Sequence, residues 1–180
     1  MQNDFIDGAL GTPEALAILP AVKELTDTFD GDIYFTRDTH YENYMESAEG
    51  KKLPVPHCIK GSHGWQISSA LDTGRAVGII DKITFGSTEL ARLLKERENE
   101  IESITLIGIC TDICVISNAM LIKAALPETP LCVVEKCCAG VTPESHKNAL
   151  SAMAMCQIDI LKITSTTLAK ITATGFYPII

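Results

Sequence analysis

One stretch of the chain has the residue types and the setting that nucleophilic chemistry needs: residues 108–115, with the sequence GICTDICV. The apolar run 104–107 before it predicts a buried strand, and the apolar spacing in 115–125 predicts a helix after it. A turn between a strand and a helix offers free N–H groups and the positive end of the helix, which favour a thiolate and a developing oxyanion. Cys114 is therefore a candidate nucleophile. The alternative is a small buried thiol without a chemical role, which is common for a cysteine taken alone.

A second group of residues could hold a metal ion. Asp38, His40 and His57 supply one carboxylate and two imidazoles, and Glu49 could add a fourth ligand. These donors suit Zn²⁺, Fe²⁺ or Mn²⁺. They belong to the long aperiodic segment 39–67, or directly precede it, and a loop of that length is usually functional or disordered. The alternative interpretation is a pair of polar loop histidines.

The other titratable residues that stand out are a lysine and two histidines. Lys82 follows the apolar residues 77–80, so it would lie at the carboxyl end of a central strand, where a lysine can shift its pKa or hold an anion. The sequence Phe85-Gly86-Ser87 should turn the chain back over it, although a solvated surface lysine is the alternative. His63 and His146 lack neighbouring ligands and are expected at the surface.

Composition limits the classes of function. The chain has 180 residues, of which 46% are hydrophobic, and a net charge of −8. The negative charge argues against nucleic acid or an anionic membrane as the main partner, and no apolar run approaches the roughly 18 residues of a membrane helix. Seven cysteines without regular spacing fit reduced thiols, so we expect a cytoplasmic protein.

Helices and strands are expected to alternate along the chain. The expected helices are 13–29, 87–98, 112–125 and 142–156, and the expected strands are 32–36, 77–80, 104–109, 131–135 and 158–163. We interpret Cys137-Cys138 as a strand end entering a loop. This alternation predicts a parallel sheet with helices on both faces, which binds ligands beyond the carboxyl ends of its strands. Asp38, Lys82 and Cys114 all follow expected strands and should converge at that edge.

The ordered set of motifs resembles a known family, the isochorismatase-like cysteine hydrolases, and within it the nicotinamidase-related amidases. The motifs are Gln2-Asn3-Asp4-Phe5, Asp38-x-His40, Pro56-His57-Cys58, Lys82 and residues 108–115. The resemblance extends from Met1 to about Ile163 and implies a three-layer α/β/α fold with a mostly parallel, Rossmann-like central sheet. It also implies a homo-oligomer that binds neither nucleic acid nor membranes.

The resemblance implies roles for individual residues. The family's Cys–Asp–Lys triad places the nucleophile at Cys114 and the lysine at Lys82. A cis peptide before Cys110 would direct the backbone amides of Cys110 and Cys114 into an oxyanion hole. Phe5 and Phe85 would supply aromatic walls of the substrate pocket.

The same resemblance implies a cofactor and a reaction. One divalent transition metal ion per chain (Zn, Fe or Mn) would be held by Asp38, His40 and His57, with Glu49 as a fourth position. The implied reaction hydrolyses a small carboxamide, with nicotinamide first among candidates, through a thioester to the acid and ammonia. The alternative is a non-catalytic member that binds a small molecule or a partner subunit. Isochorismate hydrolysis is disfavoured because that branch lacks the catalytic cysteine and the metal set.

One departure from the family pattern concerns the start of the chain. The family motif reads Asp-x-Gln-Asn-Asp-Phe, and its first Asp, the general base, would lie one residue before Met1. Asp4 matches the second, structural Asp. The central strand expected before the motif is also absent, which would leave two inner strand edges unpaired at about 1 kcal/mol or more per lost backbone bond. We therefore expect residues 1–180 to form a single isochorismatase-like domain that is truncated at its N-terminus. The alternative is a real short form that is inactive or repairs the gap by strand swapping.

Overall fold

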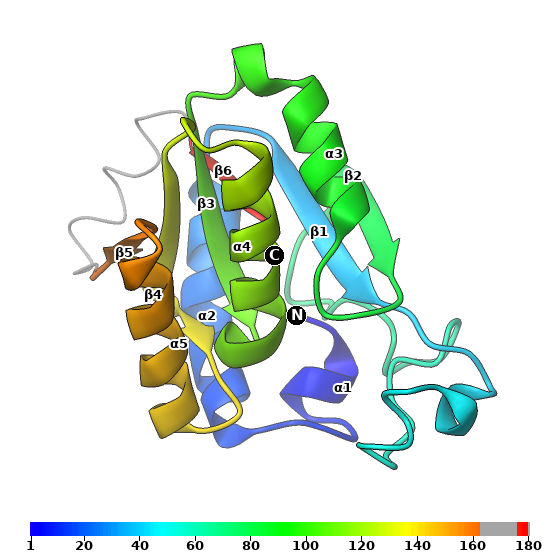
Figure 1. Ribbon diagram of the computed structural model, residues 1–180. Helices are drawn as coiled ribbons and strands as arrows, with labels where there is room; N and C mark the ends of the chain where they lie inside the picture. The colour runs from blue at the N-terminus through cyan, green and yellow to red at the C-terminus, as the bar shows by residue number, and fades with distance from the viewer. Residues whose placement is uncertain (163–175, 180) are drawn as a thin grey trace.

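A six-stranded parallel sheet forms the middle layer of the computed structural model, which describes residues 1–162 and 176–179 (Figure 1). The strands are β1 (Ile33–Asp38), β2 (Ala76–Lys82), β3 (Ser103–Ile109), β4 (Leu131–Ala139), β5 (Asp159–Leu161) and β6 (Phe176–Ile179). Their order across the sheet is β2-β1-β6-β3-β4-β5, and every pairing is parallel.

Helices cover both faces of this sheet, so the predicted three-layer α/β/α fold is confirmed. The helix α2 (Pro13–Thr28) packs on one face, and the short α1 (Asn3–Ile6) precedes it. The helices α3 (Thr88–Glu96), α4 (Ile116–Ala125) and α5 (Pro143–Met155) pack on the other face (Figure 1). In the part of the chain that the structure describes, no helix is long and apolar enough to span a membrane.

Side-chain caps explain why three helices begin where they do. The hydroxyl of Thr12 accepts a hydrogen bond from Ala15 N at the start of α2, and that of Ser87 accepts one from Leu90 N at the start of α3. At α5, Thr142 and Ser145 form a reciprocal capping box before and after Pro143. The helix expected from residue 112 begins differently, since residues 111–115 form a π-helical turn before α4.

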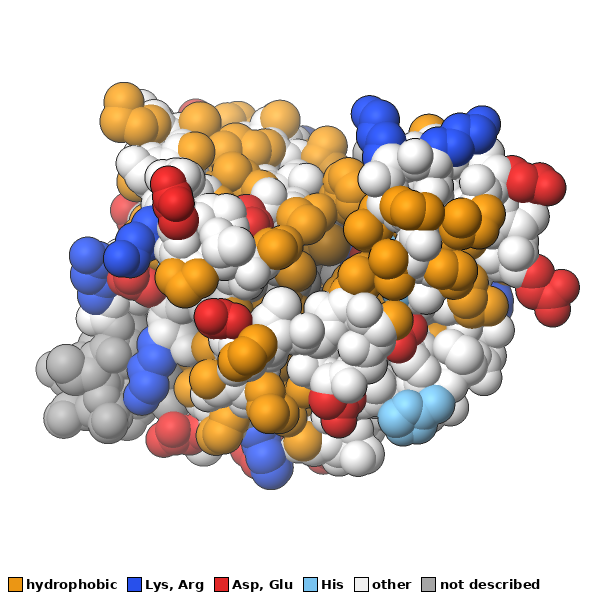
Figure 2. All heavy atoms as spheres, turned by 90° about the horizontal axis from the view of Figure 1, so that it is seen from below, with side chains coloured by type: hydrophobic (Ala, Val, Ile, Leu, Met, Phe, Trp, Pro, Cys, Tyr) orange, Lys and Arg blue, Asp and Glu red, His pale blue; other side chains and the backbone are white. Residues whose placement is uncertain are grey.

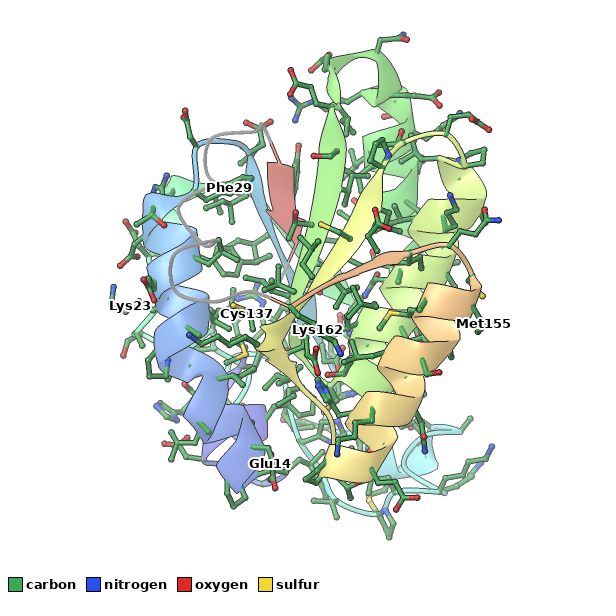
Figure 3. All side chains as sticks on the ribbon, turned by 90° about the vertical axis from the view of Figure 1, so that its left-hand side faces the viewer. Glu14, Lys23, Phe29, Cys137, Met155 and Lys162 are labelled. Atoms are coloured by element: carbon green, nitrogen blue, oxygen red, sulfur yellow. The ribbon has the colours of Figure 1, made fainter. Side chains whose placement is uncertain are left out.

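Two apolar clusters fill the spaces on either side of the sheet. Alternate residues of a strand face opposite layers, so Phe35 packs toward α2 while its neighbour Tyr34 packs toward α3 and α4. In Figure 3, Phe29 and Cys137 point into the layer between α2 and the sheet, whereas Lys23 points outward. Cys137 and Cys138 are buried residues at the end of β4, before the loop that leads to α5, as expected of a strand end, although β4 extends four residues beyond the expected strand 131–135.

The strand β6 occupies the centre of the sheet, between β1 and β3. Four of its residues pair with β3, and one pair, Tyr34 with Ile179, joins it to β1. The expectation of two wholly unpaired inner edges was therefore wrong. Buried strand edges require partners for their N–H and C=O groups. Pro178 made this segment look unlike a central strand in the sequence, because proline has no N–H to donate to the ladder. The expected strand 158–163 is shorter, as β5, and residue 163 lies outside the described residues.

The carboxyl ends of the strands meet at one edge of the sheet, where the site residues gather. Lys82 ends β2, the outermost strand rather than the central one that we expected, but the side chain is still buried. The segment 39–67 runs across this edge and includes a 3₁₀ turn at Tyr44–Glu46. Isolated bridges join His40 to Ile59 and Gln2 to Ile67. Figure 2 views this edge from below and shows hydrophobic side chains gathered around a hollow.

Candidate active site

Cys114, Lys82 and Asp38 lie in mutual contact at the carboxyl edge. Asp38 and Lys82 are register partners at the ends of β1 and β2, and the Lys82 ammonium forms an ion pair with Asp38 Oδ1. Lys82 Nζ also lies 3.5 Å from Cys114 Sγ and donates to the Thr84 carbonyl at 3.2 Å. Cys114 Sγ lies 3.9 Å from Asp38 Oδ2. The predicted convergence of these three side chains is therefore present in the structure.

The electrostatics of this cluster follow from burial. Lys82 is 6% exposed and Asp38 is 4% exposed, so each charge depends on its neighbour instead of on water. Burial lowers the pKa of Lys82, and the neighbouring Cys114 partly opposes that shift. From the sequence, Asp38 was expected at the same edge as Lys82 and Cys114, but its side chain was assigned a role only in the metal group. Its contacts with Lys82 and Cys114 were missed, because they depend on the pairing register of β1 with β2.

Asp4 is placed away from this cluster. Its Oδ2 accepts a hydrogen bond from Cys58 N at 2.7 Å, and its Oδ1 accepts one from Ala9 N at 3.3 Å. A Cβ atom at Gly64 would lie 2.1 Å from the Asp4 carboxylate, so the loop packs directly on it. These contacts give Asp4 the structural role that the family pattern assigns to its second Asp.

Gln2 belongs to the N-terminal motif, and the sequence alone predicts no role for it. Its side-chain amide donates to the Asp38 carbonyl at 2.7 Å and accepts from Asp38 N at 2.7 Å. Both bonds lie at the edge of β1 beyond its single pairing with β6. Gln2 therefore satisfies the backbone of Asp38 at a point where none of the described strands does so, and it fixes the end of β1 beside Cys114.

The turn that carries Cys114 begins at a cis peptide bond between Ile109 and Cys110, as the resemblance implied. The Cys110 carbonyl accepts hydrogen bonds from Ile113 N at 3.1 Å and from Val115 N at 3.0 Å, which closes the turn. Burial raises the pKa of the Cys110 thiol to about 12, with smaller contributions from Cys114 and Asp112. Cys110 is therefore a protonated thiol at neutral pH.

The three expected metal ligands form one buried group. The ligand atoms of Asp38, His40 and His57 all lie within 4.8 Å of one another. His57 Nδ1 lies 2.8 Å from the Val55 carbonyl, which can only accept, so Nδ1 carries the proton and Nε2 offers a lone pair. Glu49 Oε1 lies 3.5 Å from His57 Nε2 and 3.8 Å from His40 Nε2.

One observation tests whether these residues fit a metal ion. His40 Nε2 is buried and has no hydrogen-bond partner among residues 1–162 and 176–179. Burial, followed by the proximity of His57, lowers the pKa of His40 to about 4, so the imidazole is neutral and can act as a ligand at pH 7. A buried unpaired nitrogen beside a carboxylate and a second imidazole fits a divalent transition metal ion.

A pocket of about 340 Å³ joins the cysteine cluster to the metal group. Asp38, His57 and Cys114 contribute to its lining, and Phe5 and Phe85 line it as expected. Its other apolar walls come from Leu10, Ala48, Leu53 and Ile113. Such a pocket, apolar with a few convergent polar groups, is typical of a small-molecule site.

The two remaining histidines differ in their surroundings. His63 is exposed and contacts Asn3, as expected of a surface residue. His146 is half-buried rather than fully exposed, and its Nδ1 lies 2.8 Å from the hydroxyl of Thr111, a contact that the sequence did not predict.

Comparison with known proteins assigns the chain to a family. The Isochorismatase domain family matches residues 1–165. An uncharacterized isochorismatase family protein of Bacillus subtilis, PncA, is 32% identical over 169 residues, which cover 84% of this chain and 89% of that protein. The chain belongs to the isochorismatase family, and the resemblance inferred from its motifs is confirmed.

Relatives with more specific names are similar over much of the chain. A nicotinamidase of Acinetobacter baylyi is 30% identical over 152 residues, covering 67% of this chain and 70% of that protein. The crystal structure of the pyrazinamidase of Pyrococcus horikoshii in complex with zinc superposes with a TM-score of 0.76. It is 28% identical and covers 91% of this chain and 95% of that one.

Proposed function

We propose that the protein is a cysteine amidohydrolase that cleaves the C–N bond of a small carboxamide, nicotinamide first among candidates. One observation carries the proposal: a single pocket is lined both by Cys114, whose thiol lies 3.5 Å from the Lys82 ammonium, and by Asp38 and His57 of the buried group of metal ligands. The relatives named nicotinamidase and pyrazinamidase support the same substrate class.

The proposed chemistry has two stages. Cys114 Sγ attacks the amide carbon, the thiol proton passes to a carboxylate, and the tetrahedral oxyanion forms beside the backbone amides of Cys110 and Cys114. The C–N bond then breaks, and the nitrogen leaves as ammonia after it receives a proton. Water attacks the resulting thioester, which releases the carboxylic acid and regenerates the thiol. Lys82 forms an ion pair with Asp38 and would keep that carboxylate ionised and oriented toward the sulfur.

The other pocket residues would bind and orient the amide. Asp38, His40 and His57, with Glu49 beside them, would hold a divalent transition metal ion. When bound, such an ion supplies a Lewis-acid contact for a ring nitrogen or another donor atom of the substrate. Phe5 and Phe85 would flank an aromatic ring and exclude water.

The identity of the proton acceptor separates this proposal from its alternative. Among the described residues, a carboxylate that contacts the thiol is that of Asp38, at 3.9 Å. Without an effective base the chain would be a non-catalytic binding protein. Help from a general base is commonly worth about 10²–10⁴ in rate, so an activity assay can separate the two functions.

The test follows ammonia release from nicotinamide and pyrazinamide. It uses the 180-residue chain and a form in which an apolar strand ending in Asp precedes Met1. We expect turnover in the extended form, its abolition by Cys114→Ala, and a far milder effect of Cys110→Ala, since only the backbone of Cys110 takes part. Equal losses in both variants would show that the nucleophile is wrongly assigned. No release of ammonia from any small amide by either form would refute the hydrolase assignment.

A further inference from the structure

The turn that carries Cys114 is attached on one side to the segment between β4 and α5. Thr111 is 0% exposed, and its hydroxyl lies 2.8 Å from Nδ1 of His146, in the first turn of α5. The next residue, Asp112, accepts hydrogen bonds from Val141 N at 3.2 Å on both carboxylate oxygens. Two consecutive residues between Cys110 and Cys114 are thus held by the same neighbouring segment, which lies beside the turn (Figure 1).

We propose that His146 is a positioning residue, which acts through the Thr111 hydroxyl to fix the backbone amides of the turn 110–114. The inference rests on the proposed function, because those amides are the proposed oxyanion hole. His146 is not among the residues that line the pocket, so it would act on the substrate only through the turn.

The chemistry of the contact explains why it would hold the turn. A buried hydroxyl needs a partner, and a threonine hydroxyl can donate or accept, so it pairs with either tautomer of the imidazole. The β-branched side chain of threonine has few rotamers, and anchoring its Oγ1 therefore restrains the Thr111 backbone. That backbone follows Cys110 directly, and the Cys110 carbonyl closes the turn by accepting from Ile113 N and Val115 N.

A close packing contact brings α5 near enough to make this hydrogen bond. Gly140 lies just before the start of α5, and a Cβ atom at that position would be 2.9 Å from His146 N and 3.0 Å from His146 Cα. Only glycine permits this approach. The capping box of Thr142 and Ser145 stabilises the same end of the helix. The imidazole of His146 faces Thr111 from its first turn.

The test compares two reactions of the Cys114 thiol that differ in whether an oxyanion forms. Pyridine-3-carbaldehyde adds reversibly: an Sγ–C bond forms and the carbonyl π bond breaks. The thiol proton passes either to the new alkoxide oxygen or to the Asp38 carboxylate, which leaves the alkoxide in place. Iodoacetamide alkylates the sulfur with loss of iodide and forms no oxyanion. We expect His146→Ala and Thr111→Val to weaken aldehyde affinity by about tenfold to a hundredfold, because displacing the oxyanion-hole amides costs factors of that order. The rate of alkylation at Cys114 should stay within about twofold, because that reaction does not use the amides.

Three further variants separate positioning from a purely structural role. His146→Asn keeps a polar atom near the place of Nδ1, and Thr111→Ser keeps the hydroxyl, so both should restore most of the aldehyde affinity. Ser145→Ala is the matched control: it removes a capping side chain next to His146 and should lower thermal stability without changing that affinity. In an active form, His146→Ala should lower kcat and leave KM unchanged.

Several results would overturn the inference. One is an unchanged aldehyde affinity in folded His146→Ala, and another is an equal loss of that affinity in Ser145→Ala. A loss of alkylation rate in His146→Ala as large as its loss of aldehyde affinity, or no recovery of that affinity in His146→Asn, would also contradict it. The proposed function can fail separately: the aldehyde and alkylation measurements need no turnover, so absence of ammonia release would leave them intact.

Discussion

Replacing Lys82 with methionine would leave the Asp38 carboxylate buried without its cation. Asp38 is 4% exposed, and among residues 1–162 its ion pair is with Lys82. Breaking a buried pair by removing one partner typically costs about 3–5 kcal/mol, a large part of the 5–15 kcal/mol that stabilises a typical domain. For a chain of this length, that loss corresponds to a fall in Tm of roughly 6–20 °C. The assay is urea unfolding with a chelator present, because Asp38 is also a candidate metal ligand.

The pairing itself is measured by a double-mutant cycle. The double variant Lys82→Met/Asp38→Asn removes both charges. Its loss of unfolding free energy should be smaller than the summed losses of the two single variants, by about 2 kcal/mol or more. Lys23 and Asp27 form an exposed ion pair on α2, with side chains 49% and 38% exposed, and Lys23→Met should cost less than about 1 kcal/mol. Additive losses at Lys82 and Asp38, or a loss at Lys82 as small as that at Lys23, would refute the electrostatic account of this cluster.

Three further predictions follow from the site and its supporting loop. Protein never exposed to chelator should carry close to one divalent transition metal ion per chain, and His57→Ala should lose it; elemental analysis that finds no metal would contradict the metal site. The pKa of Cys110, about 12, predicts that its alkylation, followed by mass spectrometry, accelerates about tenfold per pH unit between 8 and 11, because only the thiolate reacts. The exposed thiol of Cys156 should be alkylated readily at pH 8, and equal alkylation rates at Cys110 and Cys156 would contradict the raised pKa of Cys110. Gly64→Ala should destabilise the protein by about 1–3 kcal/mol in urea unfolding, because the new Cβ would displace Asp4; unchanged stability would exclude that clash.

The parts of the fold that local chemistry determines were predictable from the sequence. Thr12, Ser87 and Thr142 each marked a helix start, because a cap depends on residues within one turn of the chain. The convergence of Asp38, Lys82 and Cys114 was predictable for a related reason. Each follows a strand, and the strands are parallel, so their carboxyl ends share an edge of the sheet.

The parts that depend on distant pairing were not predictable. Lys82 was placed on a central strand because strand order is not written in local periodicity, and the structure puts β2 at the edge. β6 was missed because a four-residue segment containing a proline looks unlike a central strand. The contact of His146 was not predicted because its partner, Thr111, is 35 positions away in the sequence. Two polar residues at such a separation leave no pattern that a single sequence could show.

The position of β6 has a consequence for the order in which the molecule can be made. The central strand is the last one along the described chain, so β1 and β3 leave the ribosome long before residues 176–179 can lie between them. At about 5–20 residues per second, synthesis from β1 to β6 takes roughly 7–30 seconds. During that time the edges of β1 and β3 that face each other lack β6. The pairing of residues 34 and 179 joins distant parts of the sequence, and such contacts form slowly. The strands β1 and β3, which lead to Asp38 and Cys114, are the ones that wait for β6, so the nascent chain is the stage at which their open edges favour aggregation.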